Sequence, residues 1–284
     1  MTPIDPEFLR SRLRYRENDS HKGDFGHLLI VAGCQAMPGA AVLATGAALQ
    51  SGCGLVTVHS TGRALQAVVN NFPSAMLSED PGAWWSRMPA RLERYSAIAV
   101  GPGLGKEAET AAAFRGLLEA ARREGIPMVL DADALNILSE NPGWMPLIPT
   151  GSVMTPHLGE LRRLVSWKGE EGLDEAVRNL CHRSGCVVVV KGYRSRIFTP
   201  AGDCFINTTG NPGMAKGGSG DVLTGLAGGL MARGYTAADA AALGVWVHGY
   251  AGDCLTQERT AEAFSSRELV DGLYKGFRQL YAQP

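Results

Sequence analysis

The chain has 284 residues, of which 45% are hydrophobic and 19% are charged, a composition that is typical of folded globular proteins and argues against a disordered chain. Lys and Arg number 27 against 28 Asp and Glu, so the formal net charge is -1, and no overall field favours nucleic acid or an anionic membrane as a partner. No apolar run reaches the ~18 residues of a membrane span, and the N-terminal segment lacks the apolar core of a secretory signal.

The cysteines form no CxxC pair, no zinc-like spacing and no disulfide framework. They are Cys34, Cys53, Cys181, Cys186, Cys204 and Cys254. We interpret them as small buried residues in a reducing compartment, and we expect the protein to be cytoplasmic.

Six short apolar runs with glycine-rich ends predict strands that are buried on both faces. The runs are 27–33, 55–60, 96–103, 126–133, 151–156 and 186–192. Helical patterns lie between and after them, at 40–51, 107–123, 174–183, 220–233, 236–254 and 265–281. This alternation predicts an α/β fold with a parallel sheet covered by helices on both sides. No linker, repeat or composition shift marks a boundary, so we expect residues 1–284 to form a single domain.

Distinctive residues follow several of the predicted strands. They are Gly33, GPGLG (101–105), DADALN (131–136), TPHLGE (155–160) and KG (191–192). Because ligands of such sheets bind beyond the carboxyl ends of the strands, we expect these segments to converge on one crevice.

A glycine-rich segment, NTTGNPGMAKGGSGD, leads into the helix predicted at 220–233. Its last glycines, Gly217, Gly218 and Gly220, allow backbone amides to converge on an anion at a helix N-terminus. A Walker A motif is absent, and GPGLGK carries Lys106 where a dinucleotide fingerprint needs glycine. From the residues alone, Asp221 is either an acid/base group at the rim of an anion hole or a helix cap.

The segment GNPGMAKGGSGDVLTG resembles the signature of the ribokinase-like superfamily, in which an anion hole precedes an Asp that acts as base. More narrowly, it is similar to the ADP- or ATP-dependent NAD(P)H-hydrate dehydratases, as are HKGDFGHLLIVAG, AIAVGPGLG, VLDADALNIL, TPHLGEL and VVVVKG. The resemblance covers roughly residues 20 to 255. It implies a ribokinase-like three-layer αβα sandwich with a mostly parallel sheet, and a dehydratase domain without the epimerase domain that many members carry.

The resemblance implies dehydration of the S-epimer of hydrated NADH or NADPH. ADP or ATP, with Mg²⁺, would phosphorylate the ring hydroxyl, and phosphate would then leave. Asp221 would be the general base, and the amides of Gly218 and Gly220 would stabilise the transferring phosphoryl group. Two alternatives stay open, a vitamin-alcohol kinase of the same fold and a nucleotide-binding regulator without catalysis.

Residue by residue, the resemblance places the adenine nucleotide on Lys191, Gly192, Tyr193, Arg194 and Ser195, together with Gly218 and Gly220. It places the hydrated dinucleotide on Ala40, Gly103, His157 and Asp221.

Plain structural roles stay open for several of these residues. They are a solvated charge for Lys191, a turn for Gly103, helix packing for Ala40 and a surface loop for His157. Asp133 and Asn136 could hold Mg²⁺ through water, bind the nucleotide or cap a helix, so the metal ligands stay unassigned. A homo-oligomer is expected, with a tetramer favoured by the resemblance, and His248 is interpreted as a core residue.

Overall fold

The computed structural model describes residues 1–169 and 171–282. The strands are β1 (Thr2–Ile4), β2 (His27–Val31), β3 (Leu55–Thr61), β4 (Met76–Asp80), β5 (Ala97–Val100), β6 (Met128–Leu130), β7 (Val153–Met154), β8 (Val187–Val190), β9 (Arg196–Phe198) and β10 (Cys204–Asn207). The α-helices are α1 (Pro6–Arg10), α2 (Pro38–Gln50), α3 (Gly62–Asn71), α4 (Ala108–Glu124), α5 (Ala132–Glu140), α6 (Leu158–Leu164), α7 (Gly172–Ser184), α8 (Ser219–Ala232), α9 (Ala237–Glu258) and α10 (Ser266–Tyr281).

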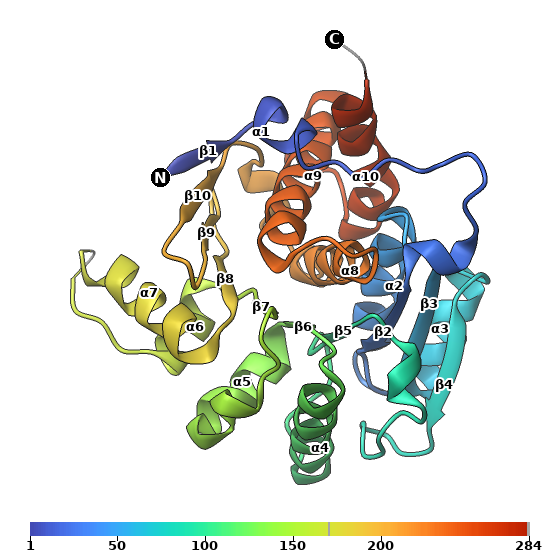
Figure 1. The fold of residues 1–284 in the computed structure, drawn as a ribbon. Helices are drawn as coiled ribbons and strands as arrows, with labels where there is room; N and C mark the ends of the chain where they lie inside the picture. Colours follow the sequence, from blue (N-terminus) through green and yellow to red (C-terminus); the bar gives the residue numbers. More distant parts are fainter. Residues whose placement is uncertain (170, 283–284) are drawn as a thin grey trace.

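All ten strands join one sheet in the order β1-β10-β9-β8-β7-β6-β5-β2-β3-β4. Neighbouring strands are parallel except at β9, which runs antiparallel to both β8 and β10. In Figure 1 the strands form a curved row between two groups of helices, with α2, α8, α9 and α10 on one side and α4 to α7 on the other. The predicted three-layer α/β sandwich with a mostly parallel sheet is therefore confirmed.

Each face of the sheet has its own hydrophobic core. One core packs the sheet against α2, α3, α8, α9 and α10, and the other packs it against α4, α5, α6 and α7. The central strands bury both faces, as in Leu28–Val31 and Ala97–Val100, which are fully inaccessible. This two-sided burial is the reason that these strands read as continuous apolar runs.

The six predicted strands correspond to β2, β3, β5, β6, β7 and β8, and the six predicted helices match α2, α4, α7, α8, α9 and α10 to within a few residues. No element was predicted at β1, β4, β9, β10, α1 or α3, and the short helices α5 and α6 lie in segments to which no helical range was assigned. The missed β4 lies at one edge of the sheet, where its MLSED sequence is largely exposed and carries no apolar run.

The carboxyl ends of the strands lie along one side of the sheet, but the predicted convergence on one crevice holds only in part. Segments 131–136, 155–160 and 191–192 contribute residues to the cavity described below, whereas Gly33 and residues 101–105 do not line it. The amide of Gly33, after β2, donates to the Pro102 carbonyl after β5 at 2.7 Å. Beyond β7 and β8, His157 and Lys191 form an isolated parallel bridge. Residues that are far apart in the chain therefore reach the same side of the sheet.

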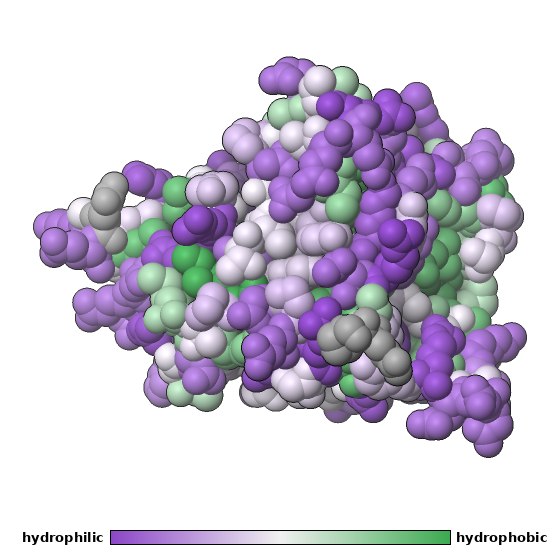
Figure 2. Space-filling model, turned by 90° about the horizontal axis from the view of Figure 1, so that it is seen from above, coloured by the Kyte–Doolittle hydropathy of each residue, from purple (hydrophilic) through white to green (hydrophobic). Residues whose placement is uncertain are grey.

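No helix among residues 1–169 and 171–282 is long and apolar enough to cross a membrane. Figure 2 shows the face seen from above, where hydrophilic residues cover most of the surface and hydrophobic residues gather in separate patches.

Helices α2 and α8 lie on the same face of the sheet and approach each other closely. A Cβ built on Gly225 of α8 would lie 1.9 Å from the backbone oxygen of Ala44 in α2. Neither backbone can move away without disturbing the sheet beneath it. Glycine at 225 therefore fixes the distance of α8 from α2 and, with it, the place of the α8 N-terminus.

We expect Gly225→Ala to lower the free energy of unfolding by about 1–3 kcal/mol, because overpacking a rigid contact outweighs the gain in helix propensity. Gly244→Ala in α9 is the matched control, since its nearest neighbour would be a side-chain carbon at 3.6 Å. The control should be neutral or stabilising by up to about 1 kcal/mol. Urea denaturation measures both variants, and equal stabilities would contradict the account.

Candidate functional site

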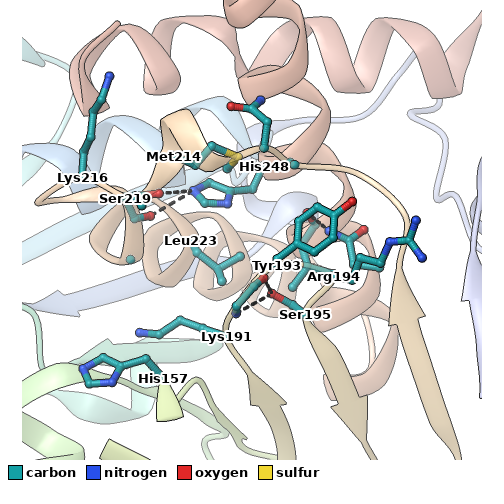
Figure 3. A pocket seen from close by; sticks show the side chains of 18 of the residues that line it. His157, Lys191, Tyr193, Arg194, Ser195, Met214, Lys216, Ser219, Leu223 and His248 are labelled. Atoms are coloured by element: carbon teal, nitrogen blue, oxygen red, sulfur yellow. Dashed lines mark hydrogen bonds between the residues drawn. The ribbon is translucent and has the colours of Figure 1, made fainter. Parts of the chain in front are cut away.

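A cavity of about 690 Å³ opens beyond the carboxyl ends of β6, β7 and β8 and the N-terminus of α8. Figure 3 shows side chains from the strand ends and from α8 and α9 around it. The residues singled out by sequence that line it are His157, Lys191, Gly192, Tyr193, Arg194, Ser195, Gly220 and Asp221. The cavity has the size and the mixed lining of a nucleotide or substrate site.

A buried ion pair stands at the inner end of this cavity. The Lys191 ammonium donates to Asp131 Oδ1 at 2.5 Å, and Glu160 Oε2 lies 3.8 Å from the same nitrogen. Burial alone would lower the pKa of Lys191, but attraction to the carboxylates of Asp131, Glu160 and Asp221 outweighs burial and raises it. Lys191 is therefore a permanent positive charge in the cavity.

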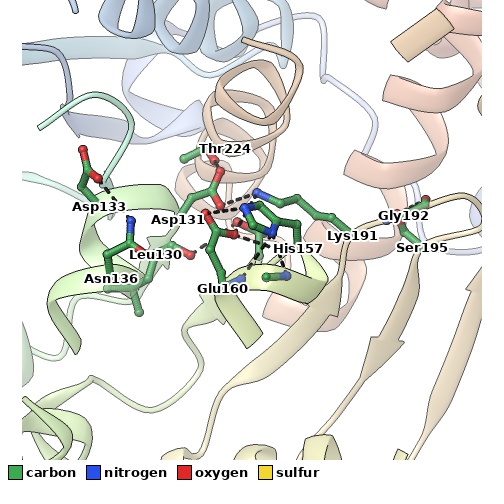
Figure 4. Close-up of polar contacts among 12 residues, drawn as sticks. Leu130, Asp131, Asp133, Asn136, His157, Glu160, Lys191, Gly192, Ser195 and Thr224 are labelled. Carbon is green, nitrogen blue, oxygen red and sulfur yellow. Dashed lines mark hydrogen bonds and ion pairs between the residues drawn. The ribbon is translucent and has the colours of Figure 1, made fainter. Parts of the chain in front are cut away.

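Asp131 joins three elements through its two oxygens. Oδ1 accepts from Lys191 at the end of β8, and Oδ2 accepts from Thr224 Oγ1 of α8 at 2.8 Å (Figure 4). Its own chain turns sharply, because Ala132 adopts φ 48°, a conformation that costs an L-residue about 1–2 kcal/mol. Gly101 makes room for this turn, since a Cβ there would lie 1.8 Å from the Asp131 carbonyl oxygen.

Asp221 lies in the first turn of α8, facing this ion pair. Burial raises the pKa of Asp221 to about 6, helped by the negative charges of Asp131 and Asp133 and opposed by Lys191. A carboxylate with a pKa near 6 is ionised at neutral pH and yet accepts a proton more readily than an ordinary Asp. These are the properties of a general base.

Two glycines before Asp221, Gly218 and Gly220, are each required by a different feature of their surroundings. Gly218 has φ 90°, and a Cβ there would lie 2.3 Å from Leu43 Cδ1. A Cβ on Gly220 would lie 3.3 Å from Lys191 Nζ and 3.4 Å from Asp131 Oδ2. Gly220 thus brings the backbone of α8 directly against the ion pair, whereas Gly218 is not among the cavity-lining residues.

His157 is the N-cap of α6. Its Nδ1 accepts from the amides of Gly159 at 3.0 Å and Glu160 at 3.3 Å, and Glu160 Oε2 accepts from the His157 amide at 2.8 Å. With Nδ1 accepting, a neutral imidazole carries its proton on Nε2. The side chain is 54% exposed, and its Nε2 lies 3.4 Å from Glu160 Oε1, so both ring nitrogens hold the imidazole in place at the cavity wall.

The loop after β8 forms the outer wall of the cavity. Ser195 Oγ donates to the Gly192 carbonyl at 3.2 Å, and Arg194 adopts φ 56° between them. Tyr193 is 76% exposed, and the centroid of its ring lies 5.5 Å from the Arg194 guanidinium carbon. A tight turn therefore presents an aromatic ring and a cation at the cavity mouth.

Ala40 and Gly103 meet each other away from the residues that line the cavity. A Cβ on Gly103, which has φ 62°, would lie 2.8 Å from the Ala40 Cβ. The same loop continues to Gly105, whose amide donates to Asp133 Oδ2 at 2.9 Å. Ala40 lies in the first turn of α2, which follows β2, and Gly103 lies just after β5. In the strand order, β2 and β5 are on the other side of β6 and its Asp131 turn from β8 and Lys191.

The possible magnesium ligands make internal contacts. Asp133 Oδ1 accepts from the Asn136 amide at 3.3 Å, and Asn136 Oδ1 accepts from Arg163 at 2.6 Å. No group of three or more His, Cys, Asp or Glu residues that could hold a metal ion occurs in the described part of the chain.

Sequence analysis did not single out Asp131, Thr224 or Glu160 as site residues. The position of Asp131 in the sequence could have indicated a site residue, because it is a carboxylate directly after the apolar residues of the predicted strand that became β6. His248, interpreted as a core residue, is buried and lines the cavity, and its Nε2 donates to the Ser219 carbonyl at 2.9 Å. Burial lowers the pKa of His248 to about 4, so it is a neutral support for the first turn of α8.

Comparison with known proteins identifies the family. The model of the family described as NAD(P)H-hydrate dehydratase matches residues 28–275. The chain belongs to the NAD(P)H-hydrate dehydratase family. More distant solved structures, with 14% identity in one case, share the ribokinase-like fold alone.

Two relatives with similar sequences and one solved structure show how similar the chain is to known members of the family. A bifunctional NAD(P)H-hydrate repair enzyme from Moorella thermoacetica is 38% identical, over 96% of this chain and 53% of the relative, so the chain spans about half the length of that relative. An ADP-dependent (S)-NAD(P)H-hydrate dehydratase from Neisseria meningitidis is 36% identical over 88% of this chain and 86% of its own. The crystal structure of the ADP/ATP-dependent NAD(P)H-hydrate dehydratase from Bacillus subtilis, co-crystallized with ATP and Mg²⁺, has a TM-score of 0.80 at 28% identity and 98% coverage of both chains.

Asp221→Asn should raise the free energy of unfolding by about 1–3 kcal/mol at about pH 8, because folding disfavours the ionised carboxylate. The folded pKa lies above the ordinary value of 3.8, at about 6. The destabilisation by the charge therefore develops as pH rises through this interval, and the variant should gain nothing at about pH 3.5. Urea denaturation at both pH values measures the effect. A variant less stable at pH 8 would show that Asp221 serves as a stabilising helix-end charge.

Proposed function

We propose that this protein dehydrates the S-epimer of hydrated NADH or NADPH, using ADP or ATP as phosphoryl donor. The observation that carries the proposal is the position of Asp221, with its raised pKa, against the Lys191–Asp131 ion pair at the N-terminus of α8. The nucleotide would occupy the cavity beside the 191–195 loop. The hydrated ring would lie toward Ala40, Gly103 and His157, so that Asp221 stands between the two substrates.

In the first step, Asp221 takes the proton of the hydroxyl on carbon 6 of the ring. The resulting oxygen attacks the terminal phosphorus of the nucleotide, and the bond from phosphorus to the bridging oxygen breaks. ADP leaves when ATP is the donor, and AMP leaves when ADP is the donor. In the second step the ring nitrogen donates its lone pair, the carbon–oxygen bond breaks, and phosphate departs. The departing phosphate or a water molecule then takes a proton from carbon 5, and the electrons of that bond form the double bond that restores the dihydropyridine.

The cavity supplies positive charge where phosphoryl transfer needs it. Lys191 stays protonated, and the first residues of α8, Ser219 to Asp221, line the cavity, so the partial positive charge of the helix N-terminus is added there. Mg²⁺ would neutralise nucleotide phosphates here, held by one carboxylate such as Glu160 or Asp131 together with water and phosphate oxygens. That mode of binding fits a cavity that is lined by the carboxylates of Asp131, Glu160 and Asp221 and that has no three-residue metal cluster among the described residues.

The domain organisation and the oligomeric state of the protein are also proposals. We infer a single domain that acts as a homo-oligomer, with a tetramer favoured by the family resemblance. Met76 and Leu77 support a self-contact, because they are 40% and 43% exposed on β4 at the edge of the sheet. We expect the protein to act in the cytoplasm, where nicotinamide and adenine nucleotides are made.

The direct test is recovery of absorbance at the dihydronicotinamide band. Hydrated NADH or NADPH is mixed with the protein, Mg²⁺ and either ADP or ATP. We expect recovery with at least one nucleotide, and the same assay identifies the donor. Nucleotide consumption without recovery would favour a kinase that stops at the phosphate ester, and no reaction with either nucleotide would overturn the proposal.

Asp221→Asn should lower kcat by about 10² or more while nucleotide affinity is retained, because an amide cannot accept the hydroxyl proton. The control is Asp239→Asn. Asp239 occupies the same third position of its helix, α9, but lies outside the cavity lining. It should leave kcat unchanged. Wild-type turnover by the Asp221 variant, measured in the absorbance assay, would rule out the base assignment and leave only the helix-end role.

A further inference from the structure

Lys216, in the glycine-rich segment before α8, has a role that the proposed reaction does not use. Its ammonium donates to three backbone carbonyls, those of Ala261 at 2.9 Å, Glu262 at 3.0 Å and Phe264 at 2.6 Å. The same nitrogen lies 4.3 Å from the centroid of the Phe264 ring. An ammonium has three donors, so all of them are engaged by one loop.

This arrangement differs from that of a phosphate-binding lysine. Lys216 is among the residues that line the cavity, but a phosphate ligand needs a free donor, and the three donors of Lys216 are all occupied by backbone carbonyls. Figure 3 shows the Lys216 side chain pointing away from Lys191 and His157. Carbonyl oxygens with an aromatic face are instead the surroundings that proteins provide for a monovalent cation.

The three carbonyls belong to the α9–α10 loop (residues 259–265), which packs against the glycine-rich segment. A Cβ on Gly213 would lie 2.6 Å from the Ala261 carbonyl oxygen and 2.8 Å from Phe264 Cε1. Just beyond this loop, Ser266 Oγ donates to the Gly217 carbonyl at 2.7 Å. The loop therefore touches the chain immediately before the first turn of α8.

On the other side, α2 limits the same turn, since a Cβ on Gly218 would lie 2.3 Å from Leu43 Cδ1 and 3.2 Å from Ser266 Cβ. The turn at Gly217 and Gly218 is thus held between α2 and the start of α10. Three residues later comes Asp221. Movement of the α9–α10 loop would release one side of this support.

We propose that Lys216 is a tethered monovalent cation that holds the α9–α10 loop against the glycine turn and thereby positions the N-terminus of α8. Lys216 is a positioning residue, and it makes no contact with the transferring phosphoryl group. Removal of the side chain leaves a group of carbonyls that suits a free cation of similar size, such as K⁺ or NH₄⁺. The kinetic consequence rests on the proposed dehydratase function, but the structural consequence does not.

The first measurement is hydrogen–deuterium exchange of the full-length chain over residues 211–222 and 258–267. Wild type, Lys216→Ala, Lys216→Met and the control Lys168→Met, an exposed lysine outside the cavity lining, are compared in KCl, NaCl and choline chloride at equal ionic strength. In choline, both Lys216 variants should exchange about tenfold faster or more, as expected for the loss of charge-assisted hydrogen bonds. KCl should restore protection in the Ala variant only, because the Met side chain fills the vacated space.

Wild type and Lys168→Met should show the same exchange in all three salts. Unchanged exchange in both Lys216 variants would overturn the proposal. So would an Ala variant in which KCl protects no better than choline. If the Ala variant unfolds in choline, KCl must restore its thermal transition more than NaCl does, and failure to do so also overturns it.

The second measurement separates positioning from phosphate binding. In the absorbance assay, Lys216→Ala should lose kcat by about tenfold or more with nucleotide KM changed by less than about threefold, and KCl or NH₄Cl should restore kcat. A large rise in nucleotide KM with no cation rescue would make Lys216 a phosphate ligand instead. If wild type does not act on the hydrates, the proposed function fails, while the exchange data still decide the role of Lys216.

Discussion

The buried ion pair between Lys191 and Asp131 is the interaction on which the rest of the site depends. It joins the end of β8 to the end of β6, and through Thr224 it reaches α8. A buried charge that loses its partner is strongly unfavourable, so each element constrains the others. The pair also sets the electrostatics of Asp221, because Asp131 raises its pKa and Lys191 opposes that effect. One contact thus links the position of the Asp221 carboxyl group to its pKa.

The rest of the molecule places α8 against this pair with little freedom. Gly225 allows the backbone of α2 to approach α8, and Gly220 allows the first turn of α8 to approach the pair. Buried His248 supports the same turn through the Ser219 carbonyl. Because these contacts involve backbone, they preorganise the amides of α8 before any ligand arrives. Preorganised donors are what stabilise charge during phosphoryl transfer.

The sequence predicted the parts of the structure whose causes are local. Continuous apolar runs indicated the central strands, and the glycines before Asp221 indicated a helix N-terminus beside an anion. The partners of Lys191 were not predictable in this way, since Asp131 lies 60 residues away and is brought near only by the strand order. The contacts of Lys216 could not be predicted from residue types in the sequence, because its acceptors are backbone carbonyls, which every residue has. Edge strands such as β4 lacked a signal because they bury few side chains.

In the proposed reaction the ring hydroxyl is phosphorylated before it leaves, and the fate of its oxygen distinguishes this route from direct loss of water. Hydrated NADH labelled with ¹⁸O in the hydroxyl on carbon 6 is converted with unlabelled nucleotide and unlabelled water. The account predicts that the released inorganic phosphate carries one ¹⁸O atom, because the carbon–oxygen bond breaks after the phosphorus–oxygen bond has formed. Unlabelled phosphate, with the label recovered in water, would contradict it.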